Sequence, residues 1–79
     1  MSEREEVFRI LKDIKPMVEL DGVNDIIDGG YLDSLELMSL IAALMEKYEI
    51  EIDVDWITPE NFNSIDSIAN MIAQLKSST

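Results

Sequence analysis

The stretch Leu32-Asp33-Ser34-Leu35 organises the fold that we expect for this chain. It follows the glycine pair Gly29-Gly30 and opens a strongly amphipathic run. Asp is a preferred helix N-cap residue because its carboxylate accepts hydrogen bonds from free backbone N–H groups. The stretch therefore predicts a helix over residues 34–48 that is capped by Asp33. Ser34 would lie on its first turn, with the hydroxyl near the surface.

The expected helix 34–48 has two different faces. One is a continuous apolar stripe at helical spacing, which we assign to the core: Leu37, Leu40, Ile41, Leu44, Met45 and Tyr48. The other is a mixed face next to Ser34, which we assign to partner contact: Leu35, Glu36, Met38, Ser39, Ala42 and Glu46. The alternative is that loops cover Leu35 and Met38. Glu36 stands three residues after Asp33, which completes a capping-box pattern.

A second amphipathic helix is expected over residues 3–15. Ser2 followed by Glu5 is a capping-box pattern, and apolar residues recur at helical spacing from Val7 to Ile14. Pro16 then ends or kinks the helix. Residues 19–32 form a long loop, and its apolar residues predict that it packs onto the body of the protein.

The last third of the chain predicts a connector and two helices. Ile50 to Asp55 alternates like a strand, but no second strand is available to pair with it. We therefore expect an extended connector that buries Ile50, Ile52 and Val54. Thr58-Pro59-Glu60 begins a short helix, and Ser64 caps the final one.

The final helix has an apolar stripe that is expected to point inward: Ile65, Ile68, Ala69, Ile72 and Leu75. Residues 76–79 are expected to fray. The chain as a whole is predicted to be all-α, a single domain over residues 1–79. Three main helices form a bundle, with one short helix before the last.

The charge is strongly acidic and unevenly distributed. The chain has 17 acidic and 6 basic residues, a net charge of −11. Four of the basic residues precede Pro16, whereas Lys47 is the one base between Glu19 and Asp66. Such a surface disfavours nucleic acid, which binds to basic patches, and attracts basic protein surfaces. The alternative interpretation is an acidic coat that only maintains solubility.

Several kinds of chemistry are excluded by the residues that are absent. The chain has neither Cys nor His, so it offers no disulfide, no thiolate zinc site and no base for a serine triad. The acidic loop between Asp21 and Asp28 lacks the spacing of a calcium loop, and we expect no metal site. We therefore expect no enzyme activity of its own. The charged N-terminus and the lack of a membrane span predict a cytoplasmic protein, and we expect a monomer.

These features resemble the phosphopantetheine-dependent carrier proteins, which include acyl and peptidyl carriers. The resemblance covers nearly the whole chain. It rests on Asp33-Ser34-Leu35 opening a helix in an acidic bundle, and on Asn61 to Ile68 near the end. It implies an acyl-carrier-like fold with 4′-phosphopantetheine, taken from coenzyme A, on Ser34. Asp33 and Leu35 would flank that site.

The resemblance also implies the partners of the chain. A phosphopantetheinyl transferase would modify Ser34, a ligase would load an acyl or aminoacyl group as a thioester, and a downstream acyltransferase or synthase would consume it. Leu32 stands where fatty-acid carriers usually have a small residue, and Ser39 replaces a glutamate common in those carriers. The apolar residue before Asp33 looks more like D-alanyl and peptidyl-type carriers, and the replacement at Ser39 removes one partner contact typical of fatty-acid synthesis. We therefore expect a specialised stand-alone carrier, with fatty-acid synthesis second.

The sequence leaves two functions of different classes open. The first is the covalent carrier, which depends on Ser34. The second is an acidic helical module that binds a basic partner and holds no prosthetic group. In that second case Ser34 would be a residue of the helix start and nothing more.

Overall fold

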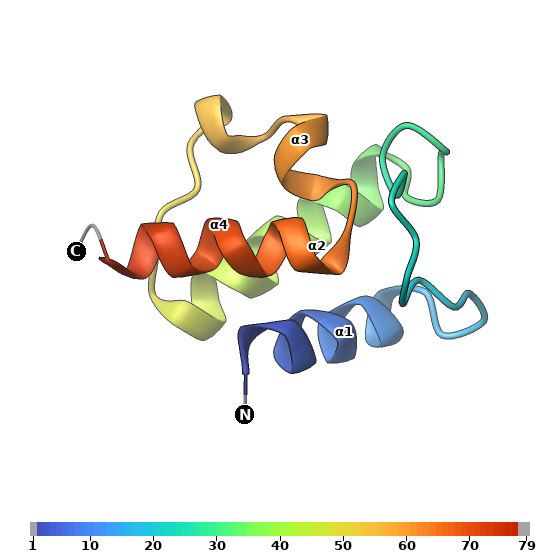
Figure 1. Cartoon of the computed structure of the whole chain (residues 1–79), viewed down its shortest axis with the longest axis horizontal. Helices are drawn as coiled ribbons and strands as arrows, with labels where there is room; N and C mark the ends of the chain where they lie inside the picture. The colour runs from blue at the N-terminus through green and yellow to red at the C-terminus, as the bar shows by residue number, and fades with distance from the viewer. Residues whose placement is uncertain (1, 78–79) are drawn as a thin grey trace.

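The computed structural model describes residues 2–77 and contains four α-helices and one 3-10 turn in that range. The elements, in chain order, are α1 (Glu3–Ile14), α2 (Ser34–Tyr48), the 3-10 turn η1 (Val54–Trp56), α3 (Pro59–Phe62) and α4 (Ile65–Ser77). Figure 1 shows α1 running in the direction opposite to α2 and α4. The prediction of an all-α bundle with one short helix before the last is confirmed.

Each helix begins where a capping side chain was predicted. The Ser2 hydroxyl accepts a hydrogen bond from the Glu5 N–H at 3.2 Å, and Thr58 Oγ1 accepts one from Asn61 at 3.3 Å. Ser64 Oγ accepts one from the Ser67 N–H at 3.0 Å. These bonds satisfy backbone donors that have no partner inside a helix. Local sequence therefore fixes the helix starts.

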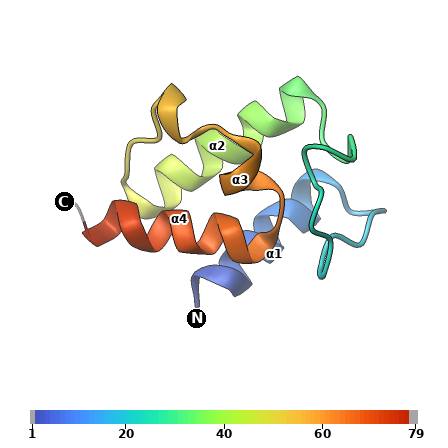
Figure 2. The same ribbon diagram turned by 45° about the horizontal axis from the view of Figure 1, so that its top comes forward.

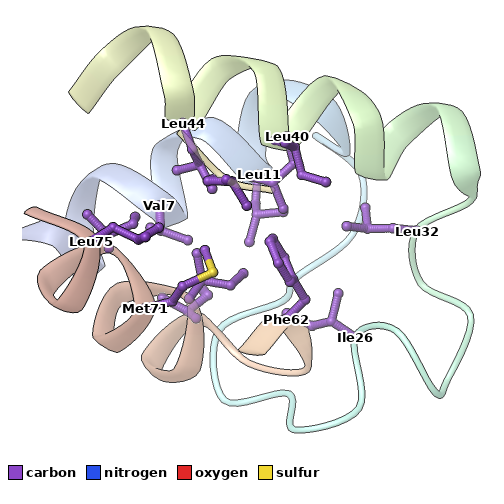
Figure 3. Packing of buried hydrophobic residues seen from close by; sticks show 14 of the residues in the cluster. Val7, Leu11, Ile26, Leu32, Leu40, Leu44, Phe62, Met71 and Leu75 are labelled. Carbon is purple, nitrogen blue, oxygen red and sulfur yellow. The ribbon is translucent and has the colours of Figure 1, made fainter. Parts of the chain in front are cut away.

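The core lies between the three long helices and is closed from one side by the loop and α3. Figure 3 shows Phe62 of α3 pointing into its centre beside Leu11. Leu20, Ile26 and Leu32 of the loop are buried, so the prediction that the loop packs onto the body is confirmed. From α2 the core takes Leu40, Ile41 and Leu44, while the other residues of the predicted stripe are half-buried against it: Leu37, Met45 and Tyr48.

The predicted connector is correct up to Ile52 and wrong at Val54. Ile50 and Ile52 are buried, but Val54 is 77% exposed. The Asp53 carboxylate accepts a hydrogen bond from the Asp55 N–H at 2.9 Å and starts the turn η1. This turn ends the alternation of the extended backbone and points Val54 outward, and Trp56 packs against the core instead.

The end of α4 also differs from the expectation. Helix α4 continues through Ser77 and does not fray at Lys76, whose ammonium lies 2.9 Å from the Glu3 carboxylate. Residues 78–79 lie outside the described range. Within the helix, Met71 is fully buried although the predicted stripe omitted it, and Ala69 is only half-buried.

Ion pairs join α1 to the elements around it. Arg4 Nη2 lies 2.6 Å from Asp21 of the loop, and Arg4 Nε lies 2.7 Å from Asp66 of α4. These two hydrogen bonds raise the pKa of Arg4, first through Asp21 and then through Asp66. Because the side chains are exposed, solvent screens both pairs and each adds little to stability. The pairs fix orientation more than they add stability.

Candidate functional site

Ser34 is the first residue of α2 and is exposed. Its position follows from its neighbours: Leu32 is buried in the core, and Asp33 is the N-cap in extended backbone. Figure 3 shows the Leu32 side chain directed toward the core, two residues before Ser34. Within residues 2–77 the Ser34 hydroxyl makes no hydrogen bond. The hydroxyl is therefore accessible from solvent.

The start of α2 is held by a complete capping box. Asp33 Oδ1 accepts a hydrogen bond from the Glu36 N–H at 2.8 Å, and Glu36 Oε1 accepts one from the Asp33 N–H at 3.0 Å. The prediction of this box from the spacing of the two acids is confirmed. It brackets Ser34 on both sides, so the backbone that carries the hydroxyl is fixed.

A tight turn over residues 25–31 precedes this helix. The Gly29 N–H donates to the Asp25 carbonyl at 2.6 Å, and a Cβ at Gly29 would lie 2.7 Å from that same oxygen. Gly30 has a φ of +74°, a conformation that other residues rarely adopt. The glycine pair is therefore required by the geometry of the turn that delivers the chain to Ser34.

Asn63 fixes the same turn from a distant part of the sequence. Its Oδ1 accepts hydrogen bonds from the Ile27 and Asp28 N–H groups at 3.0 and 3.1 Å, and its Nδ2 donates to the Asp28 carboxylate at 3.0 Å. The Asn63 carbonyl also accepts from the Ile26 N–H at 2.9 Å. We had not selected Asn63 from the sequence, because nothing local to it indicates a contact with a loop 35 residues earlier.

Lys15 is the second site residue that we had not selected. Its ammonium comes from the end of α1 and lies 3.2 Å from Glu36 Oε2. Glu36 is half-buried, and its two carboxylate oxygens contact Asp33 and Lys15. Among the residues assigned to partner contact, Glu36 is thus the one that is engaged within the chain.

The other residues assigned to partner contact lie on the exposed side of α2. Leu35 is 80% exposed and Met38 is 60% exposed, so no loop covers either of them. Ser39, Ala42 and Glu46 are exposed as well. The structure therefore places an open, partly apolar surface directly beside Ser34.

The surrounding charges are mostly unpaired and acidic. Five of the six basic side chains form ion pairs, and Arg9 forms none within residues 2–77. Eleven of the 17 acidic side chains have no ion pair in that range. They include Asp25, Asp28 and Asp33, which lie on the segment leading into Ser34. This end of the molecule therefore suits a basic protein surface.

Two clefts lie in the surface away from Ser34, and the first of them shares Glu46 with the face assigned to partner contact. One of about 380 Å³ lies between α1 and α2 and is lined by residues such as Arg9 and Lys47. Another of about 250 Å³ lies along α1 near Phe8. Neither is lined by Ser34. In the described part of the chain, no three potential metal-ligating side chains come together.

The geometry at Ser34 fits a phosphodiester-linked group. Backbone N–H groups at the start of a helix have no intrahelical partners and carry partial positive charge, which stabilises an anionic phosphate. The Glu36 N–H is bonded to Asp33, while the Ser34 hydroxyl is exposed and free. Leu35, the next residue, is also exposed, so Ser34 lies on an open surface of the described part of the chain.

Comparison with known proteins supplies the family. Residues 9–72 match the model described as "Phosphopantetheine attachment site". No curated protein sequence matches the chain. The match spans the second half of α1, all of α2 and α3, and most of α4. Domains of this type are carriers without catalytic activity that hold 4′-phosphopantetheine covalently. The chain is therefore a member of the phosphopantetheine attachment family, a carrier protein rather than an enzyme.

Proposed function

We propose that Ser34 is the residue that receives 4′-phosphopantetheine, and that the chain carries acyl or aminoacyl groups as thioesters between partner enzymes. The observation that supports this most directly is the free, exposed Ser34 hydroxyl at the N-terminus of α2, inside the region that matches the family. The bound group supplies the thiol that this chain, which has no Cys, lacks.

The chain contributes to the modification by exposing the Ser34 hydroxyl to the transferase, and it supplies no group that removes the proton. The Ser34 hydroxyl loses its proton and its oxygen bonds to the phosphorus next to the pantetheine, while the pyrophosphate bond of coenzyme A breaks and the nucleotide part leaves as 3′,5′-ADP. The sequence has no His, and the carboxylate of the adjacent residue, Asp33, is bonded to the Glu36 N–H. The general base must therefore come from the phosphopantetheinyl transferase. What this chain provides is a serine held in a fixed helical turn.

We propose further that partner enzymes bind the surface formed by Leu35, Met38, Ala42 and Glu46. The basic residues in this contact would belong to the partner. The exposed apolar side chains and the unpaired acids nearby support this assignment. Electrostatic attraction raises the association rate of such complexes more than it raises their affinity. The partners would be the transferase, a loading ligase and a downstream acyltransferase or synthase.

The class of cargo is a narrower proposal. Ser39 on the exposed face, where fatty-acid carriers commonly have a glutamate, supports an acyl or aminoacyl group delivered by an adenylating ligase. Leu32 gives less support, because its burial in the core explains an apolar residue at that position. We propose that the chain acts as one carrier domain and as a monomer in the cytoplasm. None of the helices within residues 2–77 has the length and apolar character needed to cross a bilayer.

The test is intact-mass measurement after incubation with coenzyme A, Mg²⁺ and a broad-specificity phosphopantetheinyl transferase. Wild type should gain one phosphopantetheine, and Ser34→Ala should gain none. Ser77→Ala, which removes an exposed hydroxyl at the end of α4, outside the face assigned to partner contact, should be modified like wild type. An unmodified wild type with normal helical circular dichroism would favour the acidic interaction module without a prosthetic group.

A further inference from the structure

The carboxylate of Glu36 is occupied within the chain on both of its oxygens. Oε1 accepts the hydrogen bond from the Asp33 N–H at 3.0 Å, and Oε2 lies 3.2 Å from Lys15 Nζ. The exposed fractions of the two side chains are 28% for Lys15 and 25% for Glu36. Within residues 2–77 this is the one ion pair in which both side chains are less than a third exposed. It is therefore less screened by solvent than the others.

Lys15 is itself held in place at the end of α1. It is the C-cap residue, and its N–H donates to the Leu11 carbonyl at 2.8 Å. Pro16 follows and ends the helix. From this position the ammonium spans from α1 to the first turn of α2, and the carboxylate that it meets is the one that closes the capping box. Lys15, Glu36 and Asp33 thus form one connected set of contacts around the backbone of Ser34.

We infer that Lys15 and Glu36 are positioning residues for the modification of Ser34, and that Glu36 is not an acid that docks a basic partner. This inference rests on the proposed function of Ser34. A docking acid must offer its carboxylate to the partner, whereas that of Glu36 is half-buried and already paired. The carboxylates of Asp25 and Glu46 are exposed and make no ion pair in the described region, so they are suited to docking.

The two roles of Glu36 predict opposite effects when Lys15 loses its charge. If Glu36 docks a basic partner, Lys15→Gln frees its carboxylate and makes the surface more acidic, so modification becomes faster. If Glu36 positions Ser34, Lys15→Gln loosens the capping box and the first turn of α2 frays more often, so modification becomes slower. The sign of the change therefore decides between the two roles.

The experiment measures kcat and KM for transfer of phosphopantetheine onto wild type, Lys15→Gln, Lys15→Arg and Lys12→Gln. Lys12 is the matched control because its pair with Glu19, at 3.7 Å, is exposed on both sides and does not contact the capping box. Lys12→Gln removes the same charge from the same helix. It therefore reports the effect of losing one positive charge at α1, together with the Glu19 pair and the position of the ammonium over the Phe8 ring, without any contact to the capping box.

We expect Lys15→Gln to lower kcat/KM about fivefold relative to Lys12→Gln, mainly through kcat, in line with the loss of one helix cap. Lys15→Arg should restore most of the rate, because its guanidinium keeps the ion pair. In the unmodified protein, amide hydrogen exchange at Asp33 and Glu36 should be faster in Lys15→Gln than in Lys12→Gln. Circular dichroism should show all variants folded.

Each outcome has one meaning. Equal or faster transfer onto Lys15→Gln than onto Lys12→Gln overturns the positioning role and restores Glu36 as a docking acid. Unchanged amide exchange at Asp33 and Glu36 also overturns it, whatever the transferase does. A third outcome is that wild type is not modified while amide exchange changes as expected. The proposed function of Ser34 is then wrong, but the role of the Lys15–Glu36 ion pair in holding the start of α2 stands.

Discussion

Asn63 offers the sharpest test of how the turn before Ser34 is held. The change is Asn63→Ala. Asn63 has helical backbone angles, φ −76° and ψ −14°, which alanine adopts without strain. The substitution therefore removes the amide contacts to Ile27 and Asp28 and leaves the backbone of Asn63 as it was.

The expected cost follows from the bonds that are lost. The Asn63 side chain accepts from two backbone N–H groups and donates to one carboxylate. A net contribution of about 0.5–1.5 kcal/mol for each bond, reduced because the site is partly open to water, gives a loss of about 2 kcal/mol. For a domain of this size, that loss lowers the melting temperature by about 10 °C.

Thermal unfolding followed by circular dichroism measures the effect, with Asn70→Ala as the control. Asn70 is exposed on α4, and the same chemical change there should alter the free energy of unfolding by less than about 0.5 kcal/mol. A melting temperature for Asn63→Ala within about 3 °C of that for Asn70→Ala would show that the bonds to the loop contribute nothing. The account of how Ser34 is delivered would then be wrong.

Two further predictions concern the packing of α2. Leu44 is fully buried, so Leu44→Ala should lower the free energy of unfolding by about 2–4 kcal/mol in urea titrations, and an unchanged midpoint would refute the assigned core face. The Tyr48 hydroxyl is buried without a hydrogen-bond partner in the described residues, and its pKa is raised by burial and then by Glu6 and Glu3. Tyr48→Phe removes that unpaired group and should raise stability by up to about 1 kcal/mol, so a clear loss of stability in the same titration would contradict the geometry.

Much of the fold was predictable because its signals are local. The capping side chains of Ser2, Asp33, Thr58 and Ser64 each lie within three residues of the N–H group that they accept from, so the spacing alone indicates them. The apolar stripe of α2 identified its buried face in the same way. Where the local pattern was broken by a turn, as at Val54, the prediction from alternation was wrong.

Two contacts at the site, those of Lys15 and Asn63, depend on how the helices pack around the core. Figure 2 shows the loop that joins α1 to α2 at the end of the molecule opposite the C-terminus. Lys15 at the end of α1 contacts Glu36 in α2, and Asn63, the C-cap residue of α3, contacts Asp28 in the loop. Neither contact leaves a pattern in the sequence, because both partners are ordinary polar residues at large separation.

The sequence by itself determined the helices, the apolar faces and the exposed serine at the start of a capped helix. Helix caps and amphipathic periodicity depend on residues a few positions apart, and both can be inferred from the order of residues. Only the tertiary structure decided which charged side chains are free and which are engaged, and so separated Glu36 from Asp25 and Glu46. Ion pairs between elements depend on how the helices pack, which is set by the whole core and not by any short segment.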